Sequence, residues 1–185
     1  EVPHRFRNAI RLGLAQEKVR RDRYAGIMHW CIFSSIVVLP FVTAQVAIEG
    51  DTPIHFLHGT YYLIFSFYGD LFGLIGLVGV GMALNRRYFQ DFHRIRWDER
   101  LEDHLIILGL GFVLLTGFFV ETARIMVTEL VQHPDWAPWS FVSYVLALGM
   151  AQLELSDDTI LGMHIVLWWT HIRSEEHTSE LQSHL

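Results

Sequence analysis

Long runs of apolar residues alternate with short polar segments along this chain. Three runs, roughly 25–48, 59–84 and 105–126, each reach the ~20 residues that an α-helix needs to cross the hydrocarbon core of a bilayer. Because the apolar residues are concentrated in these blocks, lipid is the expected solvent of the helices. We expect Pro40 to kink the first helix, which a membrane helix tolerates when neighbours satisfy the freed carbonyl.

Two further apolar segments are shorter. Residues 139–153 form a run that is short for a span and more typical of an interfacial or re-entrant helix. After it, Ser156 or Asp157 is placed to cap a new helix that begins at about residue 159. The pattern therefore predicts an all-α fold, a polytopic transmembrane helix bundle with three complete spans plus one truncated span.

The last span is truncated because its apolar part ends at residue 172. Counted from 159, it rises only ~21 Å at 1.5 Å per residue, which is less than the ~30 Å hydrocarbon core. The polar string "RSEEHTSELQSH" that follows resembles the conceptual translation of a sequencing-library adapter. We therefore expect three parts: 1–24, a basic cytoplasmic segment; 25–172, a transmembrane bundle; and 173–185, adapter-derived sequence. Since the chain begins with Glu rather than Met, we expect the bundle to be a fragment.

Basic residues predict the orientation of the spans. Of the 14 Lys and Arg residues, seven precede residue 24 and five lie within 86–100, so twelve flank the same side. The positive-inside rule makes that side cytoplasmic and places the linkers 49–58 and 127–138 outside. We expect a multi-pass protein of a prokaryotic-type cytoplasmic (inner) membrane, with its N-terminal segment cytoplasmic.

Composition excludes several classes of protein. The single cysteine, Cys31, rules out a disulfide framework and a four-cysteine iron–sulfur site within this chain. No nucleotide-binding loop, nucleophile triad or nucleic-acid-binding motif occurs. The lipid bilayer is thus an expected partner and nucleic acid is not.

Four histidines within or beside the spans are candidate metal ligands. His29 lies near the cytoplasmic start of the first span and His58 at the outer mouth of the second, while His164 and His171 are seven residues apart and nearly on one helix face. Helix bundles hold haem through imidazoles on facing helices, and by depth His58 is placed to meet His164. The alternative is that each histidine is a hydrogen-bonded packing residue. Glycines at 73, 76, 79 and 81 allow close approach of either a helix or a porphyrin.

Charged residues inside the spans are further candidates. A buried carboxylate at Asp70 is a possible catalytic proton relay during quinol chemistry, or a hydrogen-bond partner of a neighbouring helix. Glu121 and Arg124 are spaced i, i+3 and are expected to pair. The functional alternative for this pair is contact with a quinone or a haem propionate.

Several segments resemble one family. "RDRYAGIMHWCIF", "FLHGTYYLIFSFYGDLFGL" and "LGMHIVLWWTH" are similar to the membrane cytochrome b subunit shared by the gamma subunit of respiratory nitrate reductase and heterodisulfide-reductase-related iron–sulfur proteins. The resemblance covers roughly residues 3–171. It implies five helices, two haems b held by four histidines, quinone or quinol as substrate, and iron–sulfur clusters on a following region or a partner subunit.

The family's ligands match this chain only in part. By resemblance, His29 is the inner-side ligand of its helix, but Leu39 stands where the family has a second histidine, so His58 is the candidate replacement. His171 best matches the first ligand of the last helix, with His164 an additional candidate. The family's final ligand would lie about five turns further on, where the adapter-like sequence stands.

These observations predict a membrane-bound haem b electron-transfer subunit of a respiratory chain. It would pass electrons between the quinone pool and a cytoplasmic iron–sulfur domain or subunit, as part of a quinone-linked membrane oxidoreductase that is inactive as this fragment alone. The alternative is a haem-free membrane scaffold or an ion or proton transporter segment, in which the histidines and Asp70 serve translocation.

Overall fold

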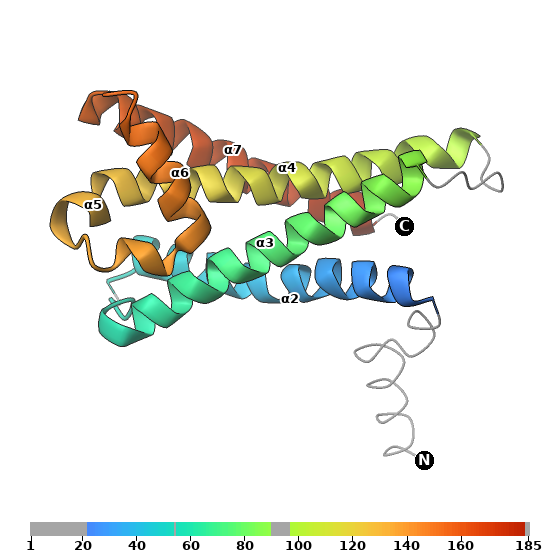
Figure 1. The fold of residues 1–185 in the computed structure, drawn as a ribbon, viewed down its shortest axis with the longest axis horizontal. Coiled ribbons are helices and arrows are strands. Elements are labelled where there is room, and N and C mark those ends of the chain that lie inside the picture. The colour runs from blue at the N-terminus through green and yellow to red at the C-terminus, as the bar shows by residue number, and fades with distance from the viewer. Residues whose placement is uncertain (1–21, 54, 90–96, 184–185) are drawn as a thin grey trace, which may run out of the picture.

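The computed structural model describes residues 22–53, 55–89 and 97–183, and within them every regular element is a helix. Figure 1 shows these helices as a bundle whose long members run roughly lengthwise beside one another. The predicted all-α class is therefore confirmed. Most of the basic segment expected at 1–24, and the centre of the basic loop expected within 86–100, lie outside the described residues.

Three helices are long and apolar enough to cross a membrane: α2 (Arg23–Asp51), α3 (Gly59–Phe89) and α4 (Trp97–Val127). They contain the three predicted spans, and α4 begins eight residues before the apolar run expected from 105. Helix α2 runs through Pro40 without a break in its assignment. Large apolar side chains such as Trp30, Phe41 and Val78 are exposed on these helices, as expected where lipid rather than water is the solvent.

Helix α7 (Asp157–Ser183) returns along α4 (Figure 1). Ser156 caps it, because the Ser156 hydroxyl oxygen accepts a hydrogen bond from the Thr159 amide at 3.3 Å. The helix continues beyond residue 172, where its apolar sequence ends. The polar residues that follow contain no Pro or Gly, so they favour continuation of a helix although they do not suit lipid. Consistent with this change, α7 is not among the helices apolar enough to span a membrane.

Short elements cover one end of the bundle. After α4 come α5 (Glu129–Gln132), the 3-10 helix η3 (Ala137–Trp139) and α6 (Phe141–Ala151), and Figure 1 shows α6 crossing over α4. Helix α6 has 11 residues, which agrees with the prediction of an apolar helix too short to span. Buried residues beneath it form the main hydrophobic cluster, which comprises Ala123, Ile125, Met126, Ala137, Ala147 and Ile160.

Small residues bring α2 and α3 together. A Cβ atom built on Gly79 would lie 2.9 Å from the Cβ of Cys31, and one on Gly76 would lie 2.8 Å from the Ser35 hydroxyl oxygen. At these two positions it is therefore helix α2 that approaches the glycines of α3 closely. A Cβ atom on Gly81, by contrast, would have nothing within 4 Å, so this glycine serves no such contact among the described residues.

Candidate functional site

A cavity of about 1050 Å³ lies between α2, α3, α4 and α7. Its lining is mainly apolar, with a few ionisable groups, which is the composition expected of a site for a cofactor or an organic ligand. Its volume is at the upper end of the range common for such sites. The ionisable side chains in its lining are Glu49, Tyr62, Asp70, Glu121, Arg124, His164 and His171.

His171 is held against α4 at one side of this cavity. Its Nδ1 lies 3.0 Å from the Thr116 hydroxyl oxygen, and Thr116 directs its own proton to the carbonyl oxygens of Phe112 and Val113, 3.0 and 2.9 Å away. When the Thr116 proton goes to one of these carbonyls, the Thr116 oxygen accepts and Nδ1 of His171 carries the proton. In this tautomer Nε2 has the lone pair that a metal requires.

Gly117 makes room for the His171 ring. A Cβ atom at Gly117 would lie 3.2 Å from Cε1 of His171, tighter than ordinary side-chain contacts. The helix surface is thus shaped for an imidazole at this point.

His164 lies two turns before His171 and also lines the cavity, so the structure brings the two residues to one space as their spacing predicted. The His164 imidazole makes no hydrogen bond within the described part of the chain, but it lies close enough to Glu121 and Arg124 to interact with their charges. His164 is therefore placed toward the charged end of the cavity.

The other two predicted ligands lie elsewhere. His29 stacks on Phe33 with ring centroids 6.3 Å apart, and its Nδ1 is buried with no hydrogen-bond partner among the described residues. His58 is exposed just before α3. Neither His29 nor His58 lines the large cavity, so the expected meeting of His58 with His164 is not seen. The described residues also contain no group of three or more His, Cys, Asp or Glu that could hold a metal ion.

Asp70 holds the start of α6. One of its carboxylate oxygens accepts hydrogen bonds from the amides of Val142 (2.6 Å) and Ser143 (3.1 Å), and the other accepts one from the Ser143 hydroxyl at 2.8 Å. First-turn amides lack partners within their own helix, so this carboxylate acts as a cap supplied from a distant residue. The expected contact of Asp70 with a neighbouring helix is thus observed, and its role as a proton relay stays a prediction.

Arg124 is the centre of a polar cluster at the end of the bundle covered by α6. The predicted ion pair with Glu121 is present at 2.6 Å, and a second one joins Arg124 to Glu129 at 2.8 Å. Arg124 also donates to the Tyr62 hydroxyl at 2.5 Å, and Ser140 donates to Glu121 at 3.0 Å. Sequence reasoning missed Glu129 because it lies in a linker expected to face water, and no local pattern marks Tyr62.

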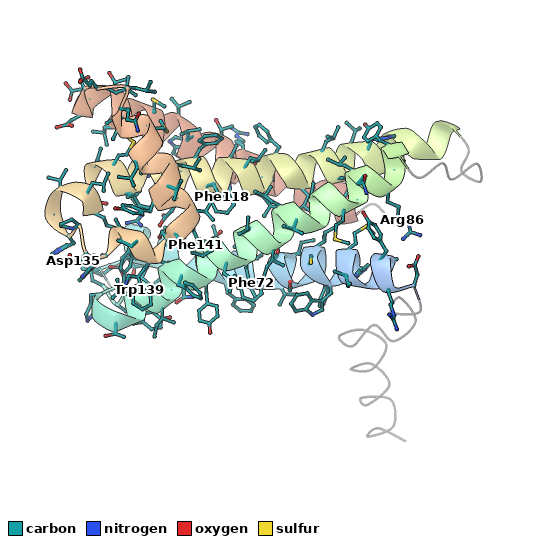
Figure 2. All side chains as sticks on the ribbon, in the orientation of Figure 1. Phe72, Arg86, Phe118, Asp135, Trp139 and Phe141 are labelled. Atoms are coloured by element: carbon teal, nitrogen blue, oxygen red, sulfur yellow. The ribbon has the colours of Figure 1, made fainter. Side chains whose placement is uncertain are left out.

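Two charged residues labelled in Figure 2 lie at opposite ends of the bundle. Figure 2 labels Asp135 at the end where this cluster lies and Arg86 at the opposite end. Phe118, also labelled there, belongs to the interior, where its ring lies against Gly73. The placement of Arg86 agrees with the expected grouping of basic residues at one end.

Fold and cavity together define a polytopic helical protein with three helices suited to a membrane and an internal cavity able to hold an organic ligand. No family model and no solved structure matches the chain. It is similar to two oxidoreductases. Over 168 residues it is 30% identical to the EtfAB:quinone oxidoreductase of Syntrophomonas wolfei, and over 161 residues 26% identical to the probable iron-sulfur-binding oxidoreductase FadF of Bacillus subtilis.

Each of these matches covers 85% of this chain but only 22% and 21% of the respective relative. The chain thus spans about a fifth of the length of the relatives it matches. Similarity to this part of two oxidoreductases is what the comparisons show. The membrane cytochrome b subunit family that its motifs resemble stays a prediction.

Proposed function

We propose that this chain is the membrane part of a haem b electron-transfer oxidoreductase that passes electrons between the quinone pool and a cytoplasmic iron–sulfur module. The observation that carries the proposal is His171, hydrogen-bonded through Nδ1 to Thr116 at the wall of a large apolar cavity. The names of the two relatives, a quinone oxidoreductase and an iron-sulfur-binding oxidoreductase, support the same chemistry.

The residues present fit haem b at one axial position, which His171 would occupy. Ligating histidines commonly donate their second ring N–H to an oxygen, as His171 does to Thr116, which fixes the ring orientation and raises the basicity of the ligating nitrogen. His29, whose buried Nδ1 lacks a partner among the described residues, is the candidate ligand of a second haem. His164, which lines the cavity, and His58, which does not, remain predicted ligands without an assigned partner. When bound, haem b supplies one-electron redox chemistry.

The remaining contribution of this chain is the environment of that chemistry. The apolar lining of the cavity excludes water and lowers the local dielectric, and the small residue Gly117 lets the His171 ring pack against α4. Tyr62, Glu121 and Arg124 give the cavity one polar end, where a quinone headgroup can form hydrogen bonds.

The proposed orientation follows from charge. The end of the bundle that carries Arg23 and Arg86 is cytoplasmic by the positive-inside rule, and the end covered by α6 faces outward. A prokaryotic-type inner membrane would place the iron–sulfur domain or subunit at the basic end. We also propose that residues 173–185 derive from an adapter, because their polar sequence does not suit the continuation of a membrane helix.

A second candidate function is a haem-free ion or proton transporter segment, which the partly buried ionic cluster around Arg124 favours. An optical difference spectrum, reduced minus oxidised, of the purified full-length protein separates the two. We expect a haem b α band that His171→Ala reduces and His55→Ala, an exposed control, leaves unchanged. A protein without that band would exclude the haem proposal.

A further inference from the structure

A second, smaller cavity adjoins the large one. Its volume is about 200 Å³, and Tyr62 and Arg124 line both cavities. On the far side of these two side chains, the smaller cavity is lined by Glu129 and by His133, which is exposed and stacks on Trp136 with ring centroids 4.5 Å apart. With Leu57, which also lines both, Tyr62 and Arg124 therefore separate the large cavity from a path to the surface, and they are the polar residues of that partition.

The hydrogen bonds across this partition have a defined direction. A guanidinium only donates, so the Tyr62 hydroxyl oxygen accepts from Arg124 at 2.5 Å and directs its own proton to Glu129 Oε1. Tyr62 and Glu129 are both almost fully buried, so bulk water does not compete for these bonds. The Tyr62 hydroxyl is thus a link between the large cavity and a carboxylate beyond it.

The charge balance of the cluster makes Glu129 the carboxylate that can accept a proton. The cluster contains two carboxylates and one guanidinium, so it carries one uncompensated negative charge when both acids are ionised, which is costly in a buried position. Glu121 uses both oxygens, at 2.6 and 2.9 Å from Arg124 nitrogens. Glu129 Oε2 is buried and has no partner among the described residues, so a proton bound there would neutralise the cluster.

We propose that Tyr62 and Glu129 form a proton-transfer route between the large cavity and the surface at the α6 end. The inference rests on the proposed function, which supplies a quinol to the large cavity. Oxidation of a quinol to a quinone releases two electrons and two protons, and the electrons leave to oxidised haem, one at a time. For each proton, a quinol hydroxyl gives its proton to the Tyr62 oxygen while Tyr62 passes its own to Glu129.

Glu129 then releases each proton to water in the smaller cavity, on the side where His133 reaches the surface. In quinone reduction the same route carries protons inward. Other ionisable groups face this path: Glu49 and His164 from the large cavity, and Glu121 and Arg124 within the cluster. Of these four residues only Arg124 lines both cavities. Arg124 cannot relay a proton, because a guanidinium keeps its proton.

The test uses the full-length protein in lipid vesicles, with menadiol as the quinol. Tyr62→Phe and Glu129→Gln should each slow quinol oxidation about 100-fold, which is within the range for a lost proton-transfer group, while the haem band stays unchanged. Glu129 does not line the large cavity, so Glu129→Gln should also keep the affinity for a quinone-analogue inhibitor. Glu129→Asp should restore part of the rate. Tyr61→Phe is the matched control, since that neighbouring tyrosine is exposed and bonded to Gln45.

Two readouts distinguish proton transfer from a structural effect. The slowed variants should show a larger solvent isotope effect and a shifted pH profile, and the infrared band of a protonated carboxyl that appears on turnover should be absent in Glu129→Gln. Wild-type rates and pH profiles in both Tyr62→Phe and Glu129→Gln would overturn this inference alone. A wild-type protein that neither binds the inhibitor nor oxidises menadiol would overturn the proposed function as well.

Discussion

The Nδ1 atom of His171 lies 3.0 Å from the hydroxyl oxygen of Thr116, a residue 55 positions earlier in the chain. This bond joins α7 to α4 and fixes the imidazole at the wall of the large cavity. It makes Thr116 a residue that positions a candidate haem ligand.

The first prediction concerns this bond. Thr116→Val removes the acceptor while keeping the shape of the side chain, so the affinity for haem b should fall about tenfold, at the low end of the effect of such supporting contacts. Titration of the haem-depleted protein with haem, followed by absorbance, measures the change. Thr170→Val is the control, because Thr170 is exposed on α7 and its hydroxyl donates to the carbonyl of Val166 in the same helix at 2.7 Å. Equal affinities in the two variants would contradict the prediction.

The second prediction concerns the cap on α6. Asp70→Ala removes the acceptor of three hydrogen bonds and leaves the buried amide of Ser143 unpaired, so the free energy of unfolding should fall by about 2 kcal/mol. Limited proteolysis should also cut the segment between α5 and α6 faster, because the start of α6 loses its anchor to α3. Asp135→Ala, at an exposed position, should change neither quantity. Unchanged stability and cleavage in Asp70→Ala would show that the cap is dispensable.

The third prediction compares two glycines of α3. Gly79→Ala places a Cβ atom 2.9 Å from Cys31 Cβ and 3.0 Å from the backbone nitrogen of Ile32, so α2 must move and the protein should lose about 1–3 kcal/mol of stability. Gly81→Ala meets nothing within 4 Å and should gain about 0.5–1 kcal/mol through helix propensity. Unfolding of both variants in mixed micelles measures the difference, and the opposite order would be incompatible with the packing described.

The fourth prediction concerns the ionic cluster. Arg124→Met leaves two carboxylates without their counter-charge, and Glu129 is only 5% exposed, so the protein should lose about 3 kcal/mol of stability. Arg23→Met, at an exposed position on the first turn of α2, should have little effect. A double variant, Arg124→Met with Glu129→Gln, should recover part of the loss because it removes one buried charge. Denaturant titration of the three proteins checks this order of stability.

Local features of this protein were predictable from sequence. The positions of the spanning helices follow from runs of apolar residues, and the cap at Ser156 and the pair Glu121–Arg124 follow from contacts within a few residues. Such interactions depend on the geometry of one helix and need no knowledge of its neighbours. The prediction that α6 is too short to span was confirmed for the same reason.

Other features depended on which helices meet. Tyr62 and Glu129 are 67 residues apart, and Asp70 and Ser143 are 73 apart, so no periodicity relates them. We expected His58 to meet His164 because their positions along the predicted spans place them at similar depths in the membrane. Depth does not determine which side of a helix a residue faces, and His58 lies outside the cavity.

The sequence by itself thus determined that this chain forms apolar helices and which segments form them, because burial in lipid acts on each segment alone. Only the tertiary structure decided that His171 meets Thr116 and that Glu129 lies in the protein interior beside Arg124. The physical reason is that a buried polar group must find its partner wherever the packed helices bring one, and that partner is set by packing rather than by position along the chain.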